Sequence, residues 1–220
     1  MCGRFTLTLP PDLLAEAFDL DDVPPLEARY NIAPTQPVAV VRKLRPDGPR
    51  QLDLLRWGLT RAAAPGARRG GPVINLRSES VATRSAFRDA FRRRRCLVPA
   101  DGFYEWAPGG GGRQAFHVTR KDGRPLGLAA LWEPAVAGGA PASCVILTTE
   151  PNELIRPIHD RMPVIVDSAD YERWLAPEAT DPAAIAGLLV PYAAGALAAR
   201  AVGPTVNNAQ NEVPACLDPM

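Results

Sequence analysis

Apolar residues recur at helical spacing in only a few short stretches of the chain. In PPDLLAEAF (10–18) one side of a helix would carry Leu13, Leu14, Ala17 and Phe18. In SESVATRSAFRDAFRRRR (78–95), Phe87 and Phe91 are four residues apart and are expected on a buried side. Two shorter stretches are also predicted as helical: NELIRPIH (152–159) and SADYERWLA (168–176). The helices are therefore expected to be few and short.

Strand-like apolar runs occupy most of the remaining chain. They are PVAVVRK (37–43), QLDLLRWG (51–58), CLVPADGFYEWAP (96–108), QAFHVTRKDG (114–123), PLGLAALW (125–132), ASCVILTTE (142–150) and MPVIV (162–166). The glycines at 109–112 separate two of these runs as the tip of a hairpin would. Because glycine-rich stretches fall at such tips, we predict one α+β domain over 1–220, built mainly of antiparallel strands.

Composition and charge narrow the class of protein. The chain is 46% hydrophobic, which is enough for a globular core, and its formal net charge is +1. That balance gives no general basic excess of the kind that nucleic-acid-binding proteins often carry. No apolar run approaches the ~20 residues of a membrane helix, and no secretory signal is present. We therefore expect a cytoplasmic or nucleoid-associated protein without a membrane partner.

Four cysteines are present, at positions 2, 96, 144 and 216. They form no CxxC pair and no zinc-ligand spacing with histidine, so neither a metal nor another cofactor is predicted. Cys96 and Cys144 lie in apolar strand-like runs and are expected to be core residues.

Cys2 requires a different explanation, because an exposed thiol near a chain end is a liability. If Met1 is removed, Cys2 carries an α-amine and a β-thiol on one residue. Such a 1,2-aminothiol attacks an aldehyde as an amine and then closes on it as a thiol. The reaction needs proton transfer, for which a carboxylic acid and a histidine are the usual groups.

The chain has two histidines, in different settings. His117 lies within a strand-like run and is expected to be a structural residue. His159 lies in IHDRMPV, an irregular segment at the end of a strand, where catalytic groups concentrate. His159 is therefore the candidate for proton transfer, with a structural capping role as the alternative.

Glu105 is the candidate carboxylic acid. Strand alternation places Phe103 and Glu105 on one face, and Tyr104 and Trp106 on the other. If Glu105 points into an apolar cleft, its pKa rises toward neutrality; the alternative is an exposed carboxylate on a solvated face. In INLRSES, Asn75 and Arg77 are two residues apart and share a face if the segment is extended.

Seven sequence blocks occur in the order seen in one protein family. They are MCGRF (1–5), RYNIAPTQ (29–36), WGL (57–59), INLRSES (74–80), CLVPADGFYEW (96–106), IHDRMPVI (158–165) and VNNAQNE (206–212). The chain thereby resembles the SRAP (SOS response-associated peptidase-like) family, whose members shield abasic sites in DNA. The resemblance spans residues 2 to about 212, nearly the whole chain.

The resemblance implies a β-rich α+β fold with a positively charged, DNA-binding cleft across its centre. It implies that Cys2, freed of Met1, captures the ring-opened aldehyde of an abasic site in single-stranded DNA as a thiazolidine, a covalent crosslink. Asn75 would orient the Cys2 backbone and the sugar, Glu105 would act as general acid and base, and His159 would assist ring opening.

The resemblance also implies residues that contact DNA. They are Arg4, Asn31, Trp57, Arg77, Trp106 and Arg161. Arg77 and Arg161 would hold the phosphates that flank the lesion, and Trp106 would stack on a base or form the cleft wall.

Two arginine-rich segments need separate interpretation. After WGL, family members often carry tryptophans that wedge against bases, whereas this chain reads LTRAAAPGARRGG and has no aromatic residue there. Arg61, Arg68 and Arg69 are candidates to compensate through phosphates, which would make DNA binding more salt-dependent. For RRRR at 92–95, a solvated helix end is favoured over a DNA contact.

Other functions remain open from the residues alone. A cysteine freed by removal of Met1 also serves N-terminal-nucleophile hydrolases, as a peptidase or a glutamine amidotransferase. A third possibility is a non-covalent single-stranded DNA-binding module with an incidental cysteine. The protein is expected to be a monomer.

Overall fold

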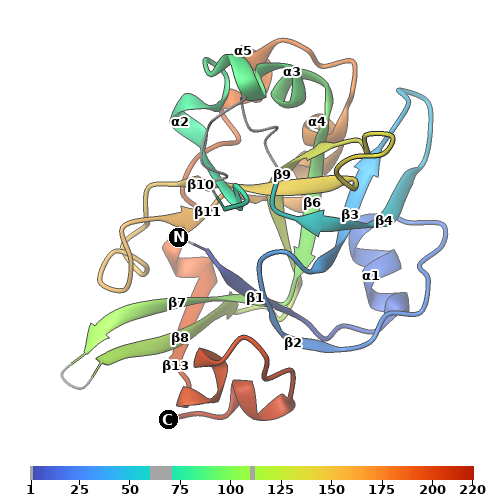
Figure 1. Cartoon of the computed structure of the whole chain (residues 1–220). Coiled ribbons are helices and arrows are strands. Elements are labelled where there is room, and N and C mark those ends of the chain that lie inside the picture. Colours follow the sequence, from blue (N-terminus) through green and yellow to red (C-terminus); the bar gives the residue numbers. More distant parts are fainter. Residues whose placement is uncertain (1, 60–70, 110–111) are drawn as a thin grey trace.

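Strands form most of the regular structure of the computed structural model, which describes residues 2–59, 71–109 and 112–220 (Figure 1). Within these residues one sheet has the strand order β13-β8-β7-β1-β2, all antiparallel. Its strands are β1 (Arg4–Leu7), β2 (Arg29–Ile32), β7 (Gly102–Gly109), β8 (Gly112–Arg120) and β13 (Leu197–Ala201). The predicted hairpin around the glycine-rich tip is confirmed as β7–β8.

The second sheet has the order β11-β10-β4-β3-β6-β9-β12, with β5 beside β10. Its strands are β3 (Pro37–Lys43), β4 (Arg50–Trp57), β5 (Asn75–Arg77), β6 (Arg95–Ala100), β9 (Leu126–Glu133), β10 (Ser143–Thr149), β11 (Met162–Pro163) and β12 (Ile165–Val166). Because β10 pairs with both β4 and β9, the strands β3, β4, β10, β9 and β6 form a closed ring. Only the pairings of β10 with β4 and β5 are parallel among those described.

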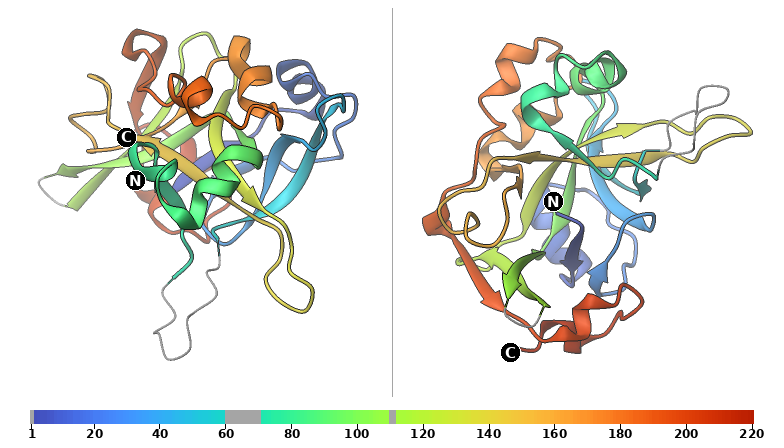
Figure 2. Two further views of the ribbon diagram at one scale, coloured as in Figure 1. Left: turned by 90° about the horizontal axis from the view of Figure 1, so that it is seen from above. Right: turned by 60° about the vertical axis from the view of Figure 1, so that its left-hand side comes forward.

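Short helices cover the second sheet. They are α1 (Pro11–Phe18), α2 (Ser78–Val81), α3 (Ser85–Arg93), α4 (Tyr171–Leu175) and α5 (Pro182–Ala186), with 3₁₀ turns at Ser168–Asp170, Ala194–Ala196, Pro204–Asn207 and Pro214–Leu217. Figure 2 shows α2, α3, α4 and α5 gathered at one end of the molecule, away from β7 and β8. None of the helices in the described ranges is long and apolar enough to cross a membrane. The β-rich α+β prediction is confirmed.

Several local predictions need correction. The helix expected over 78–95 is interrupted between α2 and α3, and Arg95 already belongs to β6. Leu13 is 45% exposed, because only Leu14 and Phe18 of its helix reach the core. The segment predicted as a helical turn at 152–159 forms turns without a regular helix.

Two predicted strands divide between different partners. The run 96–108 bends at Asp101, so β6 joins the ring while β7 joins the other sheet. Gly102 follows the bend, and a Cβ there would lie 2.5 Å from His117 Nε2, so close packing excludes a larger residue. Similarly, 162–166 divides into β11 and β12. Strand β13 was not predicted, because its alanine-rich sequence lacks the usual strand residues.

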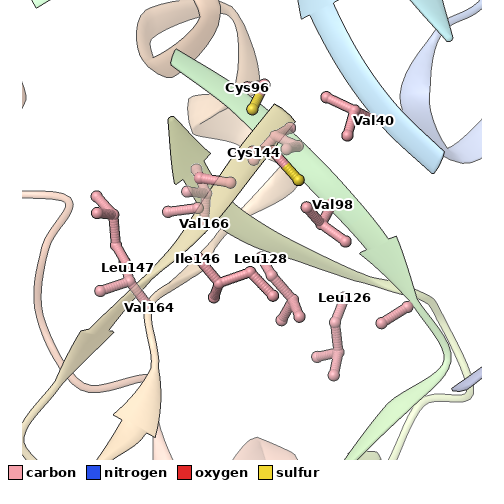
Figure 3. Packing of buried hydrophobic residues seen from close by; sticks show 14 of the residues in the cluster. Val40, Cys96, Val98, Leu126, Leu128, Cys144, Ile146, Leu147, Val164 and Val166 are labelled. Carbon is pink, nitrogen blue, oxygen red and sulfur yellow. The ribbon is translucent and has the colours of Figure 1, made fainter. Parts of the chain in front are cut away.

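The main core fills the ring and the space between the sheets. Figure 3 shows Cys96 and Cys144 packed among aliphatic side chains, including Val98, Leu128 and Ile146. Both thiols are buried and unbridged, as predicted for core cysteines.

The run at 92–95 divides between surface and core. Arg92 and Arg93 are exposed near the end of α3, as expected for a solvated helix end. Arg95 is buried instead, where its guanidinium donates hydrogen bonds to the carbonyls of Phe91 and Trp174. Arg95 is therefore a structural residue.

The C-terminal segment closes the far face of the first sheet. Tyr104 and Ala115 pack there in a small apolar cluster with Val202, Val206 and Cys216. The segment is tied to β2, because Glu212 accepts hydrogen bonds from the main-chain N–H groups of Tyr30 and Asn31. The two faces of β7 thus meet different surroundings, with the main core on one side and the C-terminal segment on the other.

Candidate active site

Cys2 lies immediately before β1 and is completely buried. The Asn75 side-chain amide donates a hydrogen bond of 2.8 Å to the Cys2 carbonyl oxygen. Asn75 is the first residue of β5, which β10 holds through parallel pairing of Ile146 with Asn75. The Asn75 Oδ1 atom is buried and accepts no hydrogen bond within the described residues. Asn75 therefore fixes the Cys2 backbone and retains an acceptor at the site.

Glu105 approaches Cys2 from β7. The register pairs Arg4 with Tyr104, which brings Glu105 level with the residues just before β1. Glu105 is 1% exposed, so it is a buried carboxylate and not an exposed one on a solvated face. Burial raises its pKa to about 7, and both protonation states are populated near neutral pH. Burial, together with the nearby Glu105 carboxylate, also raises the pKa of the Cys2 thiol, which stays protonated at pH 7.

His159 completes the group from an irregular loop. Its Nε2 atom lies 3.9 Å from Glu105 Oε2, and its Nδ1 atom accepts a hydrogen bond of 3.0 Å from the Arg161 main-chain N–H. Burial lowers the pKa of His159 below its ordinary value, so the ring is neutral at pH 7. The Nδ1 atom also lies 2.9 Å from Asp160 Oδ1, so the imidazole stands between two carboxyl groups. Its Nε2 edge faces the buried Glu105.

The predicted arginines differ in their availability. Arg161 is held firmly: its guanidinium contacts both carboxylate oxygens of Glu79, at 2.6 and 2.9 Å, and the Thr148 carbonyl oxygen at 2.5 Å. These hydrogen bonds lower the pKa of Glu79. Arg77 is exposed at the end of β5. Arg77 is therefore the more accessible cation on this side of the site.

Arg4 and Asn31 form a hydrogen-bonded pair next to the C-terminal segment. Arg4 Nη1 donates to Asn31 Oδ1 at 2.8 Å and to the Val206 carbonyl oxygen at 2.9 Å. Asn31 is fully buried, and its amide donates to the carbonyls of Val206, Asn208 and Asn211. The Asn31 side chain thus holds the C-terminal segment, and its contact with DNA stays a prediction.

Trp57 and Trp106 also differ. Trp57 is completely buried at the end of β4; its indole N–H donates to the Ile74 carbonyl oxygen at 3.0 Å, and its ring packs edge-on against Phe5. Trp57 is therefore a core residue, and its contact with DNA stays a prediction. Trp106 is only partly buried, and its indole N–H donates to Asn207 Oδ1 at 2.7 Å.

Three nearby residues were not singled out from the sequence. Glu79 and Asn207 lie within quoted sequence blocks, but nothing in the blocks indicates their partners. Arg113 carries no local signal, because its position depends on the register of the β7–β8 hairpin. Arg61, Arg68 and Arg69, predicted to compensate for missing aromatic residues, lie outside the described residues. No cluster of histidine, cysteine and carboxylate side chains that could hold a metal occurs in the described ranges.

The sequence matches a family model described as SOS response associated peptidase (SRAP) over residues 1–209. Among curated proteins, it is 35% identical over 224 residues to the abasic site processing protein YoqW of Bacillus subtilis, with 99% of each chain covered. It is 32% identical over 186 residues to the abasic site processing protein YedK of Escherichia coli, with 81% of each covered. The abasic site processing protein HMCES of Xenopus tropicalis is 26% identical, with 99% of this chain and 78% of the relative covered.

Solved structures agree on the fold. A crystal structure of a protein from Bacteroides thetaiotaomicron superposes with a TM-score of 0.82 at 19% identity, covering 100% of both chains. One from Bordetella bronchiseptica superposes with a TM-score of 0.75 at 30% identity, covering 92% of this chain and 100% of the other. The family resemblance is confirmed: this chain belongs to the SOS response associated peptidase (SRAP) family.

Proposed function

We propose that this protein captures abasic sites in single-stranded DNA, as part of the response to DNA damage, by forming a covalent adduct on Cys2. The observation that carries the proposal is the convergence of Asn75, Glu105 and His159 around Cys2 from separate parts of the chain. The printed names of the relatives, abasic site processing proteins, supply the substrate class.

The first step requires removal of Met1, which leaves Cys2 with a free α-amine. Such an amine has a pKa near ~7.7–8.0, so a useful fraction is neutral at physiological pH. The nitrogen attacks C1′ of the ring-opened deoxyribose aldehyde, and the carbonyl electron pair moves to oxygen, which takes a proton. The resulting carbinolamine loses water to give an imine. Asn75 contributes by holding the Cys2 carbonyl, and its buried Oδ1 offers an acceptor to the amine or to a sugar hydroxyl.

Glu105 supplies the proton transfers. With a pKa of about 7, its protonated form can donate to the departing water, and its carboxylate can accept a proton in the next step. The His159 Nε2 atom faces the same carboxyl group, and the imidazole would assist opening of the sugar ring. The two groups together hold and move the protons that imine formation requires.

The second step closes the ring. The Cys2 thiol adds to C1′ of the imine: the S–C bond forms, the C=N electron pair moves to nitrogen, and the thiol proton is transferred to that nitrogen through Glu105. The net reaction joins aminothiol and aldehyde with loss of one water. Because the thiazolidine has no C=N bond, the electron sink for β-elimination is gone, and strand cleavage at the lesion is suppressed.

The cations around the site suit a DNA strand. Arg77 is exposed beside Asn75, and Arg161 is oriented by Glu79, so both can flank the sugar with positive charge. Charge-assisted contacts from arginine to phosphate are strong and directional. These contacts would position the lesion over Cys2.

The direct test is a denaturing gel of the protein with a single-stranded oligonucleotide that carries one abasic site. We expect a band that survives denaturation, whose intact mass equals protein lacking Met1 plus DNA minus one water. Borohydride traps an imine but not a thiazolidine, so the wild-type adduct should form equally without it. Cys2→Ala retains an α-amine and should give product only with borohydride.

Controls separate the other functions. An undamaged oligonucleotide should give no adduct. A non-covalent DNA-binding module predicts no stable band for the wild type and unchanged binding for Cys2→Ala. A hydrolase predicts peptide or glutamine turnover that depends on Cys2, with no adduct. Absence of the band from protein whose mass shows that Met1 is gone would reject the proposal.

A further inference from the structure

A second region beside Cys2 has the form of a binding pocket. It has a volume of about 510 Å³ and is lined by Gly3, Arg4, Pro34, Trp106, Arg113 and Asn207. That volume is within the roughly 300–1,000 Å³ of small-molecule sites. Gly3 directly follows Cys2, so the pocket begins one residue from the proposed nucleophile. We call these six residues the flanking pocket.

One wall of the flanking pocket is an aromatic surface. The Trp106 indole is held by its hydrogen bond to Asn207 Oδ1, and the Arg4 guanidinium lies 5.8 Å from the ring centroid. A ring fixed at its N–H edge and partly exposed presents a face on which a flat base can stack.

The two cations of the pocket differ in what they can bind. Arg4 already donates to Asn31 Oδ1 and to the Val206 carbonyl oxygen, and it is half-buried. Arg113 is exposed, and its guanidinium makes one long hydrogen bond of 3.3 Å to the Trp106 carbonyl oxygen. Arg113 therefore has more of its five N–H donors available to an anion.

Arg113 is also close to the proposed reactive groups. The β7–β8 register pairs it with Pro108, two residues beyond Trp106. Burial raises the pKa of Glu105, and the Arg113 charge lowers it in part. Burial lowers the pKa of His159, and the Arg113 charge lowers it further. Because Gly3, the residue after Cys2, lines the same pocket as Arg113, a phosphate bound to Arg113 would lie near the captured sugar.

We propose that Arg113 binds the phosphate of the nucleotide next to the abasic sugar, in the flanking pocket whose Trp106 wall already has a base-stacking role implied by the family resemblance. The inference rests on the proposed function for its ligand, and it deepens that function by adding Arg113 to Arg77 and Arg161 as a phosphate-binding residue. Arg4 and Asn207 serve as positioning residues that hold the wall of the pocket.

The test measures reversible binding of the whole protein to a single-stranded oligonucleotide with a tetrahydrofuran abasic analogue, which has no aldehyde. Arg113→Gln should bind on the order of tenfold more weakly at low salt, because one charge-assisted phosphate contact is lost. The slope of log affinity against log salt should become shallower by about 0.7. Arg113→Lys retains the charge and should retain the slope. Arg88→Gln, an exposed change on α3 at the other end of the molecule, should match the wild type (Figure 1).

A wild-type salt slope in Arg113→Gln would overturn the assignment. So would an equal loss in Arg113→Lys and Arg113→Gln, since the effect would then not follow the charge. The same oligonucleotide with a natural abasic site tests the proposed function separately. A wild-type protein that forms no covalent adduct, while Arg113→Gln still shows the shallower slope, would reject covalent capture and leave the phosphate site standing.

Discussion

A histidine and polar side chains lie against each of the two faces of β7, and only one of these two clusters has the features of a reaction site. On the face covered by the C-terminal segment, His117 Nε2 lies 3.1 Å from Thr6 Oγ1, and its ring lies 4.8 Å from that of Tyr104. We call this the His117 cluster. On the other face, Glu105 and His159 face each other across 3.9 Å beside Cys2.

Burial affects the two clusters in opposite ways. It lowers the pKa of His117 to about 4, so that ring is neutral throughout the physiological range. It raises the pKa of Glu105 to about 7, which places that carboxyl group in the middle of the range. Loss of solvation therefore keeps His117 neutral, and it gives Glu105 a pKa at which the carboxyl group can act as an acid near pH 7. The partners differ as well: His117 is held by neighbouring strands, whereas Glu105 meets a loop histidine and the segment before β1.

The largest expected effect is on the rate of adduct formation, which should depend on Glu105 and not on His117. Glu105→Gln should slow adduct formation by 10²- to 10⁴-fold, because general acid–base catalysis typically contributes that much. His117→Gln should change the rate less than threefold in the folded protein, since no reacting group contacts it. Single-turnover crosslinking at saturating DNA measures both. Equal losses in the two variants would refute the division of roles.

The second prediction concerns stability against pH, where the clusters should have opposite signs. In the folded state Glu105 keeps its proton up to about pH 7, whereas the unfolded chain loses it near the ordinary pKa of 4.5. Rising pH therefore destabilises the fold through this window, by about 1.4 kcal/mol per pH unit. His117 stays neutral down to about pH 4, while the unfolded histidine protonates below 6.5. Rising pH therefore stabilises the fold through that window.

Between about pH 4.5 and 6.5, the opposite pH dependences that Glu105 and His117 give to the free energy of unfolding cancel in the wild type. Relative to the wild type, Glu105→Gln should gain stability as pH rises, up to about 3 kcal/mol at pH 7. Relative to the wild type, His117→Gln should gain stability as pH falls below 6.5, again by up to about 3 kcal/mol, offset by its lost packing. Urea unfolding at several pH values gives both difference curves. Curves of the same sign would show that one of the two pKa shifts is assigned in the wrong direction.

Part of this contrast was predictable from the sequence. Strand alternation correctly separates Phe103 and Glu105 from Tyr104 and Trp106, because side chains on a strand alternate whatever the tertiary context. The hairpin tip was equally predictable, since glycine at 109–112 is a local signal.

Residues whose role depends on distant partners were not predictable. Burial of Trp57 arises from Phe5 and Ile74, and burial of Asn31 arises from the C-terminal segment, neither of which is nearby in sequence. Arg113 likewise gains its position from hairpin register and from Gly3 across the pocket. The local sequence pattern predicts which face of a strand a residue lies on. Tertiary contacts determine whether that face packs in the core, lines a pocket or carries the reactive groups.

The third prediction removes the side-chain hydrogen bonds of one residue from each cluster. Asn75→Ala releases the Cys2 carbonyl and should slow adduct formation about 10- to 100-fold, because small misplacement of a nucleophile is costly. Thr6→Val preserves shape but removes Thr6 Oγ1, which pairs with His117 Nε2 and donates to the Gly102 carbonyl oxygen, and it should cost about 1–2 kcal/mol of stability with no change in rate. Crosslinking rates and urea midpoints on both variants check this. A slow Thr6→Val protein would mean that the two faces are coupled through β1.

The smallest expected effect is on reversible DNA binding and concerns Trp106, which belongs to neither cluster alone. This residue shares a face of β7 with Tyr104, yet it borders the flanking pocket. Asn207→Ala removes the hydrogen bond that orients the indole and should weaken binding of the tetrahydrofuran oligonucleotide about two- to fourfold, a fraction of the ~1–3 kcal/mol typical of base–aromatic stacking. The salt slope should not change, because no charge is removed. A shallower salt slope would instead mean that the Asn207→Ala change shifts the pocket wall and weakens the phosphate contact of Arg113. Trp106 would then support the phosphate site and would not be a stacking surface.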